Sequence, residues 1–521
     1  PKPPSTSTPS SNTKTSEPPS KSQAKLWQLL QAKEERLEYE LAKRTSSPPS
    51  SKKEQSPPYL QALRQGKALE NLELEVLDLS HEVFEQKVLL KNASIRYLKA
   101  VGSVFKQDFV CKSCRIEVIN MGSQLDKKTK THFCKQWILE DVEVQNKADF
   151  RNALFEEKGQ MYFVHFPPQG YFTFFQAKFQ HSLEILNSRL GAIDLREVDC
   201  GGNFSIKESK ILGQFNARKA HFQQSVLVAD SQFHDKFILS HAHFQGSVAI
   251  VNSLFEKSLL WQGSKFSSTF EVRDGWAEGN VFLNQACFEQ NARFCAHFEG
   301  AVYASGATFQ GTLDLSNAQF SSKLALKNAR IQGKIKMDHL KSNELEIQWQ
   351  QVHKNLLSEE EGDYSQASKE YALLLEVFER KRHYREWDEC YLAYRRAKRS
   401  SLNPNTLSKK LRKALEYCLD LSCGYGVYPF RLLSFGGVAV ILFACLYFLF
   451  AQSNLVLANK ALNISFEKAL YFSLATFVGL ETGWTPHPNS GIKWLVTLEA
   501  LVGLSTFLCF LLLLGRRWFR F

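Results

Sequence analysis

The sequence lacks the signatures of catalysis. Along its 521 residues no nucleophile with an adjacent base, no cluster of metal ligands and no phosphate-binding loop stands out, so we expect no enzymatic activity and no cofactor. The eleven cysteines follow no regular spacing, which excludes a disulfide framework and indicates reduced thiols in a cytosol. No signal peptide is apparent, and because the chain begins with Pro1 rather than Met, we expect its start to have been trimmed.

Charge is absent from residues 432–459, and residues 494–514 hold a single charged residue, Glu499. Both runs are long enough to cross a hydrocarbon core of roughly 30 Å as helices, and buried helices of soluble proteins rarely stay uncharged for so long. We therefore expect membrane spans at about 431–451 and 494–514. The first span also serves as the membrane-targeting element.

Lys and Arg are concentrated before the first run and after the second, and are sparse in the loop between them. The loop between the runs holds only Lys460, Lys468 and Lys493, whereas the outer flanks hold Lys409, Lys410, Arg412, Lys413, Arg431, Arg516, Arg517 and Arg520. Because cytoplasmic flanks are enriched in Lys and Arg, we expect both termini in the cytoplasm. Residues 380–413 hold twelve Lys or Arg, a large share of the net charge of +12. A basic collar facing anionic membrane lipids accounts for this excess better than nucleic acid does.

The first 58 residues are predicted to form a linker that contains one helix. Residues 1–22 and 45–58 are rich in Pro, Ser, Thr and Lys and cannot bury enough apolar surface to offset the cost of ordering. Residues 23–44 have leucines near one helical face. A partner-docking helix, a helix on the membrane surface and a plain solvated helix all fit this pattern.

An eleven-residue repeat occupies the middle of the chain. A bulky residue, most often phenylalanine, recurs every eleven residues. A small residue lies two positions before it, and aliphatic or aromatic pairs such as Val226/Val228 lie four and six positions after it. Positions +4 and +6 share one side of a strand but lie some 200° apart on a helix, which excludes an eleven-residue coiled coil. We expect a β-solenoid over residues 179–340 in which two units close one coil, giving about seven coils and a rod of roughly 35 Å. The repeated position is occupied by Phe222, Phe233, Phe244, Phe255, Phe266, Phe288, Phe298, Phe309, Phe320 and Ile331.

The regions on either side of the repeat are less regular. Residues 59–178 contain strand-like pieces with a broken register and are expected to form an irregular extension or cap of the solenoid. Residues 341–428 have helical apolar spacing over 343–357 and 363–400. They are expected to form a helical hairpin and a linker that join the solenoid to the first span or pack subunits together.

A cysteine pair and a His-x-Cys pair occur in the first of these regions. Cys111 and Cys114 have the spacing of a zinc knuckle, and His132 and Cys134 could complete a site. A Cys-x-x-Cys made by small residues in a β-turn is the better explanation of the first pair, because the second pair, His-x-Cys, is unusual for a zinc site. We expect no metal.

Two local patterns resemble a known family. Ala220-His221-Phe222 and Ala307-Thr308-Phe309 resemble the units of pentapeptide-repeat proteins, which implies a right-handed quadrilateral β-helix. The turn before the first span, with Gly424, Gly426, Pro429 and Arg431, completes an architecture over about residues 179–520. It is similar to bacterial pentapeptide-repeat proteins that carry a C-terminal two-transmembrane domain of the potassium-channel type.

The resemblance implies a multidomain protein with three parts. These are a cytoplasmic right-handed β-solenoid, an α-helical linker, and an all-α two-transmembrane pore domain at 429–521 that assembles as a homotetramer. It also implies a place in the bacterial inner membrane. In such a domain residues 464–476 form the pore helix and residues 476–483 the selectivity filter, namely Thr476, Phe477, Val478, Gly479, Leu480, Glu481, Thr482 and Gly483.

The filter departs from the potassium-channel motif Thr-Val-Gly-Tyr-Gly. Phe477 replaces the filter Thr, Leu480 replaces Tyr, and Glu481 replaces the second Gly, which needs a backbone conformation that few other residues tolerate. Four Glu481 carboxylates would form a ring that attracts cations, unless Glu481 is a solvated loop acid. Glu499 is expected to support the pore helix. Gly503 is either a gating hinge or a close-packing contact.

We therefore expect a weakly selective cation channel that passes K⁺ or Na⁺ and also divalent cations, gated or assembled through the solenoid. A potassium-selective channel of the same architecture is one alternative. Another is a non-conducting scaffold whose solenoid binds a cytoplasmic protein or ligand.

Overall fold

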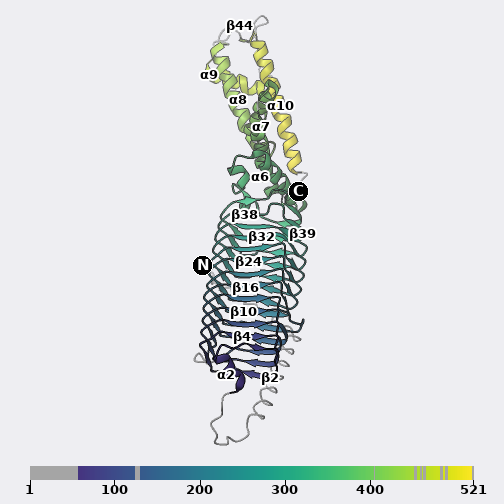
Figure 1. Ribbon diagram of the computed structural model, residues 1–521. Helices are drawn as coiled ribbons and strands as arrows, with labels where there is room; N and C mark the ends of the chain where they lie inside the picture. The colour runs from purple at the N-terminus through teal and green to yellow at the C-terminus, as the bar shows by residue number, and fades with distance from the viewer. Residues whose placement is uncertain are drawn as a thin grey trace, which may run out of the picture. The chain divides into compact units, whose positions relative to one another are not determined.

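The computed structural model describes residues 57–123, 130–403, 405–450, 455–457, 460–461, 465–480, 485–486 and 491–518. Within these residues the chain forms a β-solenoid, a set of helices that follows it, and two long apolar helices with a shorter helix between them (Figure 1). The helix expected at 23–44 and the linker segments up to residue 56 lie outside the described residues.

Four short strands make one coil of the solenoid. One such coil consists of β23 (His221–Phe222), β24 (Val226–Ala229), β25 (Gln232–Phe233) and β26 (Phe237–Ile238). The next coil begins with β27 (His243–Phe244), which pairs with β23 in parallel at an offset of 22 residues. That offset is two eleven-residue units, so the prediction that two units close one coil is confirmed.

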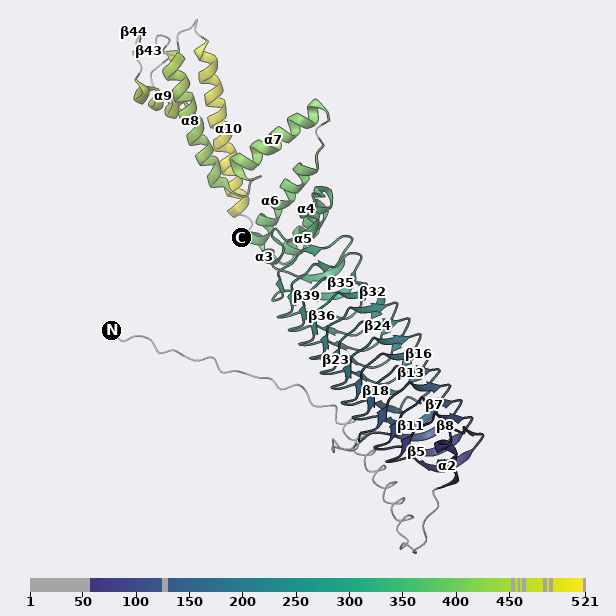
Figure 2. The same ribbon diagram turned by 60° about the vertical axis from the view of Figure 1, so that its left-hand side comes forward.

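The solenoid has about twelve turns, because twelve strands stack in one parallel ladder along one of its sides (Figure 2). They are β3 (Val83–Phe84), β6 (Val104–Phe105), β9 (His132–Phe133), β12 (Leu154–Phe155), β15 (Lys178–Phe179), β19 (Asp199–Cys200), β23, β27, β31 (Lys265–Phe266), β34 (Cys287–Phe288), β37 (Thr308–Phe309) and β40 (Arg330–Ile331). The other sides belong to a 30-stranded sheet that includes β1 (Leu69–Glu70) at the start and β42 (Lys341–Glu346) at the end.

Residues 69–178 are built into the same ladder as residues 179–340. Their coils differ in length, since the offset between paired positions is 21 residues in the first coils and reaches 28 and then 24 residues further along. The paired strands keep their stacking although the number of residues per coil varies. A fixed eleven-residue period therefore does not reveal these coils in the sequence.

Columns of stacked phenylalanine rings fill the interior. Successive ring centroids lie 4.4–5.2 Å apart, which matches the spacing of about 4.8 Å between neighbouring strands. Each buried ring contributes about 1.5–3 kcal/mol. Cys200 separates the two longest columns, which are Phe84, Phe105, Phe133, Phe155, Phe179 and Phe222, Phe244, Phe266, Phe288, Phe309.

On one side of the solenoid, a serine ladder accounts for the small residue two positions before the repeated position. The backbone N–H of Ser188 donates to Ser209 Oγ at 3.1 Å, and the same contact links Ser209 to Ser231 and Ser231 to Ser253. The residue before each serine turns the corner with a positive φ, as at Asn187 (48°). A larger side chain at the serine position would fill the space in which the next coil stacks.

Helices cover both ends of the solenoid. At the first coil, α2 (Pro58–Arg64) buries Leu60 and Leu63 in the core. At the last coil, α3 (Trp349–Val352) and α4 (Leu357–Glu360) are followed by α5 (Tyr364–Arg380). Gln351 Nε2 donates to the carbonyls of Leu326 and Ala329, both at 2.7 Å, and Glu370 Oε1 accepts from the backbone N–H of Met337 at 2.9 Å. These side chains form hydrogen bonds with backbone groups at the last coil, where no further strand follows to pair with them.

The helical part differs from its prediction in two places. The helix expected over 343–357 is strand β42 followed by the short helices α3 and α4. The helix expected over 363–400 is a hairpin of α5 and α6 (Tyr384–Ser401). The break lies at Arg382, whose φ of 55° reverses the chain so that α6 packs back against α5.

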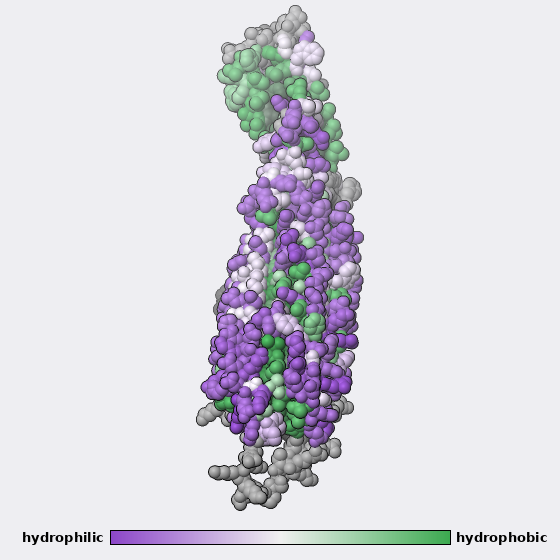
Figure 3. Space-filling view, viewed as in Figure 1, coloured by the Kyte–Doolittle hydropathy of each residue, from purple (hydrophilic) through white to green (hydrophobic). Residues whose placement is uncertain are grey.

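The C-terminal part contains the two long apolar helices. After α7 (Leu407–Cys423) come α8 (Pro429–Phe450), β43 (Leu455–Leu457), β44 (Lys460–Ala461), α9 (Phe466–Val478), β45 (Thr485–Pro486) and α10 (Ile492–Trp518). Among the described helices, α8 and α10 are the two that are long and apolar enough to cross a membrane. Figure 3 shows the apolar surface of this part in green, whereas the visible face of the solenoid is mostly polar.

Candidate functional site

The short helix α9 runs back along α8. At its start Phe466 lies against Phe448, with ring centroids 6.1 Å apart, and further along Phe472 lies 5.1 Å from Tyr447. At its end the Phe477 ring reaches Gly436, where an added Cβ would lie 3.2 Å from Phe477 Cζ. Gly436 precedes the end of α8 by nearly four helical turns, or roughly 20 Å. The C-terminal end of α9 therefore lies deep between the long helices.

The chain then returns to the level at which it left α8. Strand β43, which follows α8, pairs with β44 before α9 and with β45 after it. Helix α10 starts beyond β45 and packs along α9 so closely that an added Cβ on Gly503 would overlap the Phe477 carbonyl oxygen. The segment between the long helices is thus re-entrant: it enters from one end of the pair, reaches their middle and leaves at the same end.

Glu499 joins all three helices. Its side chain is completely buried and accepts a hydrogen bond from Tyr447 Oη of α8 at 2.6 Å. It also contacts Ser473 Oγ of α9, which lies 2.8 Å from the Val440 carbonyl oxygen. Ser473 has one hydroxyl hydrogen and two oxygen neighbours. The Ser473 hydroxyl therefore lies between Glu499 of α10 and the Val440 carbonyl of α8 and can donate to either.

Helix α9 ends two residues later than predicted. Thr476 to Val478 are helical, and Gly479 caps the helix with a φ of 81°. The N–H of Gly479 donates to the Thr476 carbonyl at 3.2 Å and that of Leu480 to the Ala475 carbonyl at 2.8 Å, which is a Schellman cap. The backbone from Thr476 to Gly479 is therefore helical or part of the helix cap rather than extended.

The expected filter residues divide into three groups. Thr476 and Phe477 are half-buried, with the Phe477 ring turned toward Gly436. Val478, Gly479 and Leu480 are exposed. Glu481, Thr482 and Gly483 lie outside the described residues.

The turn before α8 is tied to the preceding helices. Gly424, Tyr425 and Gly426 all have positive φ values, and α8 begins at Pro429. Tyr425 Oη accepts a hydrogen bond from Arg399 of α6 at 3.1 Å. Arg431 lies over the Tyr428 ring, 4.4 Å from its centroid. The turn is thus held by α6 as well as by the helices it joins.

Ion pairs fasten α7 to α6. Arg395 pairs with Glu416 at 2.8 Å, and Arg396 and Arg399 both pair with Asp420 at 2.9 Å. Burial alone would raise the pKa of Asp420, but hydrogen bonds from these two arginines hold it below its usual value. On another part of its surface α7 exposes a series of apolar side chains, among them Leu407, Leu411 and Leu415.

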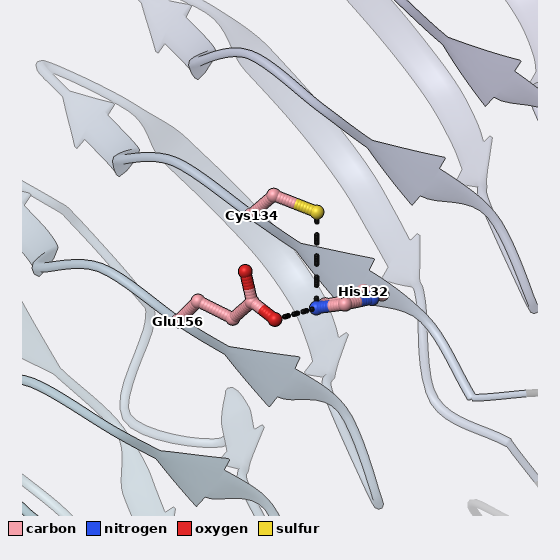
Figure 4. A group of neighbouring side chains, drawn as sticks. All are labelled: His132, Cys134 and Glu156. Atoms are coloured by element: carbon pink, nitrogen blue, oxygen red, sulfur yellow. Dashed lines mark hydrogen bonds and ion pairs between the residues drawn. The ribbon is translucent and has the colours of Figure 1, made fainter.

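The four residues with the spacing of a zinc site, Cys111, Cys114, His132 and Cys134, do not come together in one group. Cys111 and Cys114 lie in the solenoid core, where burial raises the pKa of both thiols, and Cys114 Sγ donates to the Leu90 carbonyl. His132 and Cys134 do lie together, and the third member of their group is Glu156 (Figure 4). Glu156 lies on the next coil, so only knowledge of the coil register could have revealed it in the sequence.

Comparisons of the chain with protein-family models, with curated proteins and with solved structures find no match. Its function is therefore inferred from the geometry of the chain itself.

Proposed function

We propose that the chain is a membrane cation channel, in which several copies surround a path lined by the end of α9 and the residues after it. The observation that carries this proposal is the re-entrant position of α9. Its C-terminal end lies halfway along α8 and α10, at Gly436 and Gly503. A helix C-terminus carries partial negative charge and favours a cation at that depth.

The exposed backbone at this depth needs partners. Non-helical backbone within a membrane is tolerated only where protein buries it or where it lines a water-filled cavity. Gly479 and Leu480 are exposed in a single chain. Copies arranged in a closed ring would surround these residues and leave water on the axis. Four copies are the number that the potassium-channel resemblance implies.

Weak selectivity follows from the way α9 ends. A potassium filter replaces the hydration shell of the ion by successive backbone carbonyls. Here the Ala475 and Thr476 carbonyls accept hydrogen bonds within the helix cap. Fewer carbonyls remain for the ion, and the pore passes K⁺, Na⁺ and, with Glu481 at its mouth, divalent cations. Potassium selectivity would require the last turn of α9 to unwind.

The solenoid and the helices before α8 are assigned to the cytoplasmic side of a bacterial inner membrane, with both termini on that side. The flanking cations support this orientation. Helix α7 combines exposed leucines with Lys409, Lys410, Arg412 and Lys413, which suits the surface of an anionic lipid layer. Its ion pairs to α6 give a route by which a ligand or protein on the solenoid would act on α8.

A second candidate function is a non-conducting membrane scaffold that binds its partner through the solenoid. The capped end of α9 favours it, because Phe477 and Val478 are helical rather than extended. The two functions differ in one measurable property, which is ion flux.

The test is cation flux through the purified full chain in liposomes, with K⁺ and Na⁺ gradients in turn. We expect flux of both ions, and a Glu481→Gln variant that admits divalent cations less readily. Glu467→Gln, which changes an exposed acid at the start of α9, is the matched control and should behave as wild type. An absence of flux from a confirmed oligomer would rule out the channel. A strong K⁺ preference that Glu481→Gln leaves unchanged would rule out the carboxylate ring.

A further inference from the structure

His132, Cys134 and Glu156 are brought together by the stacking of two coils. Strands β9 and β12 are parallel neighbours, with Phe133 opposite Phe155. Cys134 and Glu156 each follow one of these stacked phenylalanines, so they occupy the same position on adjacent coils. His132 lies two residues before Cys134, and residues two apart in a strand point to the same side. All three side chains therefore leave the same face of the solenoid (Figure 4).

The three donor atoms already lie at near-ligand distances. His132 Nε2 is 2.8 Å from Glu156 Oε1 and 3.8 Å from Cys134 Sγ, and all three atoms lie within 4.8 Å of one another. Zinc binds imidazole nitrogen at about 2.0–2.1 Å, thiolate sulfur at about 2.3 Å and carboxylate oxygen at about 2.0–2.2 Å, which puts the atoms of a tetrahedral site roughly 3.3–3.7 Å apart. Small side-chain rotations convert one arrangement into the other.

The surroundings leave the group free to take a cation. All three residues are half-buried. The nearest lysines are engaged elsewhere, since Lys106 pairs with Glu85 at 2.7 Å and Lys135 with Glu157 at 3.8 Å. Burial, followed by the Glu156 carboxylate, raises the pKa of the Cys134 thiol.

Related positions on the same face do not repeat the arrangement. Cys287 and Glu289 flank Phe288 in a later coil, but Glu289 pairs with Lys265 at 2.8 Å. Within the part of the chain that the structure describes, His132, Cys134 and Glu156 form the sole group of three such donors with convergent atoms. The arrangement is therefore a local feature and not a by-product of the repeat.

We propose that His132, Cys134 and Glu156 bind one zinc ion, with water as the fourth ligand. The thiolate and the carboxylate together balance the two positive charges of the ion, and the thiol proton passes to the solvent on binding. Imidazole and thiolate ligands favour zinc over magnesium or calcium. The ion links adjacent coils and leaves one coordination position open. This site is independent of the proposed channel function.

The test is metal binding by the purified full chain, first stripped with a chelator and then titrated with zinc alone against a competing chelator. Wild type should retain one zinc ion more than Cys134→Ser, His132→Gln or Glu156→Gln. Loss of a direct ligand should weaken binding at least about 100-fold, because loss of an outer-shell partner already costs about 10–100-fold. Cys287→Ser removes a half-buried cysteine from the same face and should bind as wild type does.

Cobalt provides a second, spectroscopic measurement. Cobalt bound to the wild type should show sulfur-to-metal charge-transfer absorption, and Cys134→Ser should lose it while Cys287→Ser keeps it. Circular dichroism of each variant establishes that the solenoid is folded. Equal zinc content and equal affinity in all four variants and the wild type would overturn the proposal. The absence of a charge-transfer band in the folded wild type would overturn it as well.

Discussion

Gly503 of α10 lies directly against the backbone of Phe477 of α9. A Cβ on Gly503 would overlap the Phe477 carbonyl oxygen, and the Phe477 ring in turn fills the space left by Gly436 of α8. The absence of side chains at these two glycines thus allows α8 and α10 to pack closely against α9 at Phe477. This contact fixes the depth that α9 reaches, and the proposed channel depends on that depth.

Gly503→Ala should displace α9 and reduce cation flux. The added methyl group has no free space, and overpacking of this kind costs about 1–3 kcal/mol. The measurement is flux in liposomes together with the thermal stability of the oligomer in detergent. Gly515→Ala is the matched control, because Gly515 lies on the same helix and an added Cβ there meets nothing within 4 Å. If Gly503→Ala kept wild-type flux and stability, close packing would not set the position of α9.

Glu499→Gln should preserve the helix assembly, whereas Glu499→Ala should destabilise it. Glutamine keeps a carbonyl oxygen that accepts from Tyr447 and places its amide group beside Ser473, so both hydroxyl groups keep a polar partner. Alanine leaves both hydroxyl groups buried without this partner, at a cost of about 1–3 kcal/mol for each group. Thermal unfolding in detergent measures the difference.

The control for Glu499 is Ser505→Ala, which removes an exposed hydroxyl that donates to Val502 within α10. It should leave the stability near that of the wild type. Equal destabilisation by Gln and Ala at position 499 would show that the network needs a charged carboxylate.

The sequence predicts the solenoid because the residues that stacking requires lie close together within each unit and recur at a fixed period. A bulky residue, most often phenylalanine, in each repeating unit and a small residue two positions before it favour stacking, and both are visible in the sequence around Phe222 and Phe244. The coils before residue 179 obey the same packing, but they differ in length, so that no fixed period runs through them. Their membership is decided by pairing across coils, which a fixed period does not capture.

The same distinction holds for the candidate sites. Apolar length alone predicts the two long helices. The end of α9 depends on whether Gly479 caps a helix or continues an extended strand, and both are open to a glycine. The group around His132 includes Glu156 only because two coils happen to stack in that register. Features that depend on local sequence patterns were therefore predicted, whereas features that depend on contacts between residues far apart in the sequence were not.

Asp420→Asn should loosen α7 from α6 at neutral pH. The folded-state pKa of Asp420 is held below its unfolded value by Arg396 and Arg399, so its contribution to stability is present above the unfolded pKa and is lost as pH falls through the folded value. Hydrogen exchange of α7 amides should be faster in the variant than in wild type at pH 7. The difference should shrink on acidification.

Glu278→Gln, which changes an exposed acid of the solenoid, is the control for Asp420 and should leave exchange in α7 unchanged. The same exchange rates in Asp420→Asn and wild type at pH 7 would show that other contacts hold α7 in place.

Glu370→Gln should have the opposite pH dependence at the end of the solenoid. Burial raises the folded-state pKa of Glu370 above its ordinary value, even though Ser358 and the Met337 N–H donate to it. The stability that it contributes is therefore fully present below the unfolded pKa and is lost as pH rises through the folded value. Glutamine keeps an acceptor for Met337 and carries no charge, so its variant loses nothing as pH rises.

Hydrogen exchange in α5 and in the Met337 coil, compared between Glu370→Gln and wild type at each pH, measures this effect. The two proteins should be equally protected at pH 4, and the variant should be better protected at pH 7. Glu379→Gln, an exposed position on the same helix, should match wild type throughout. A protection difference that does not change with pH would mean that Glu370 does not change its charge there, and that its role at the end of the ladder is that of a hydrogen-bond acceptor alone.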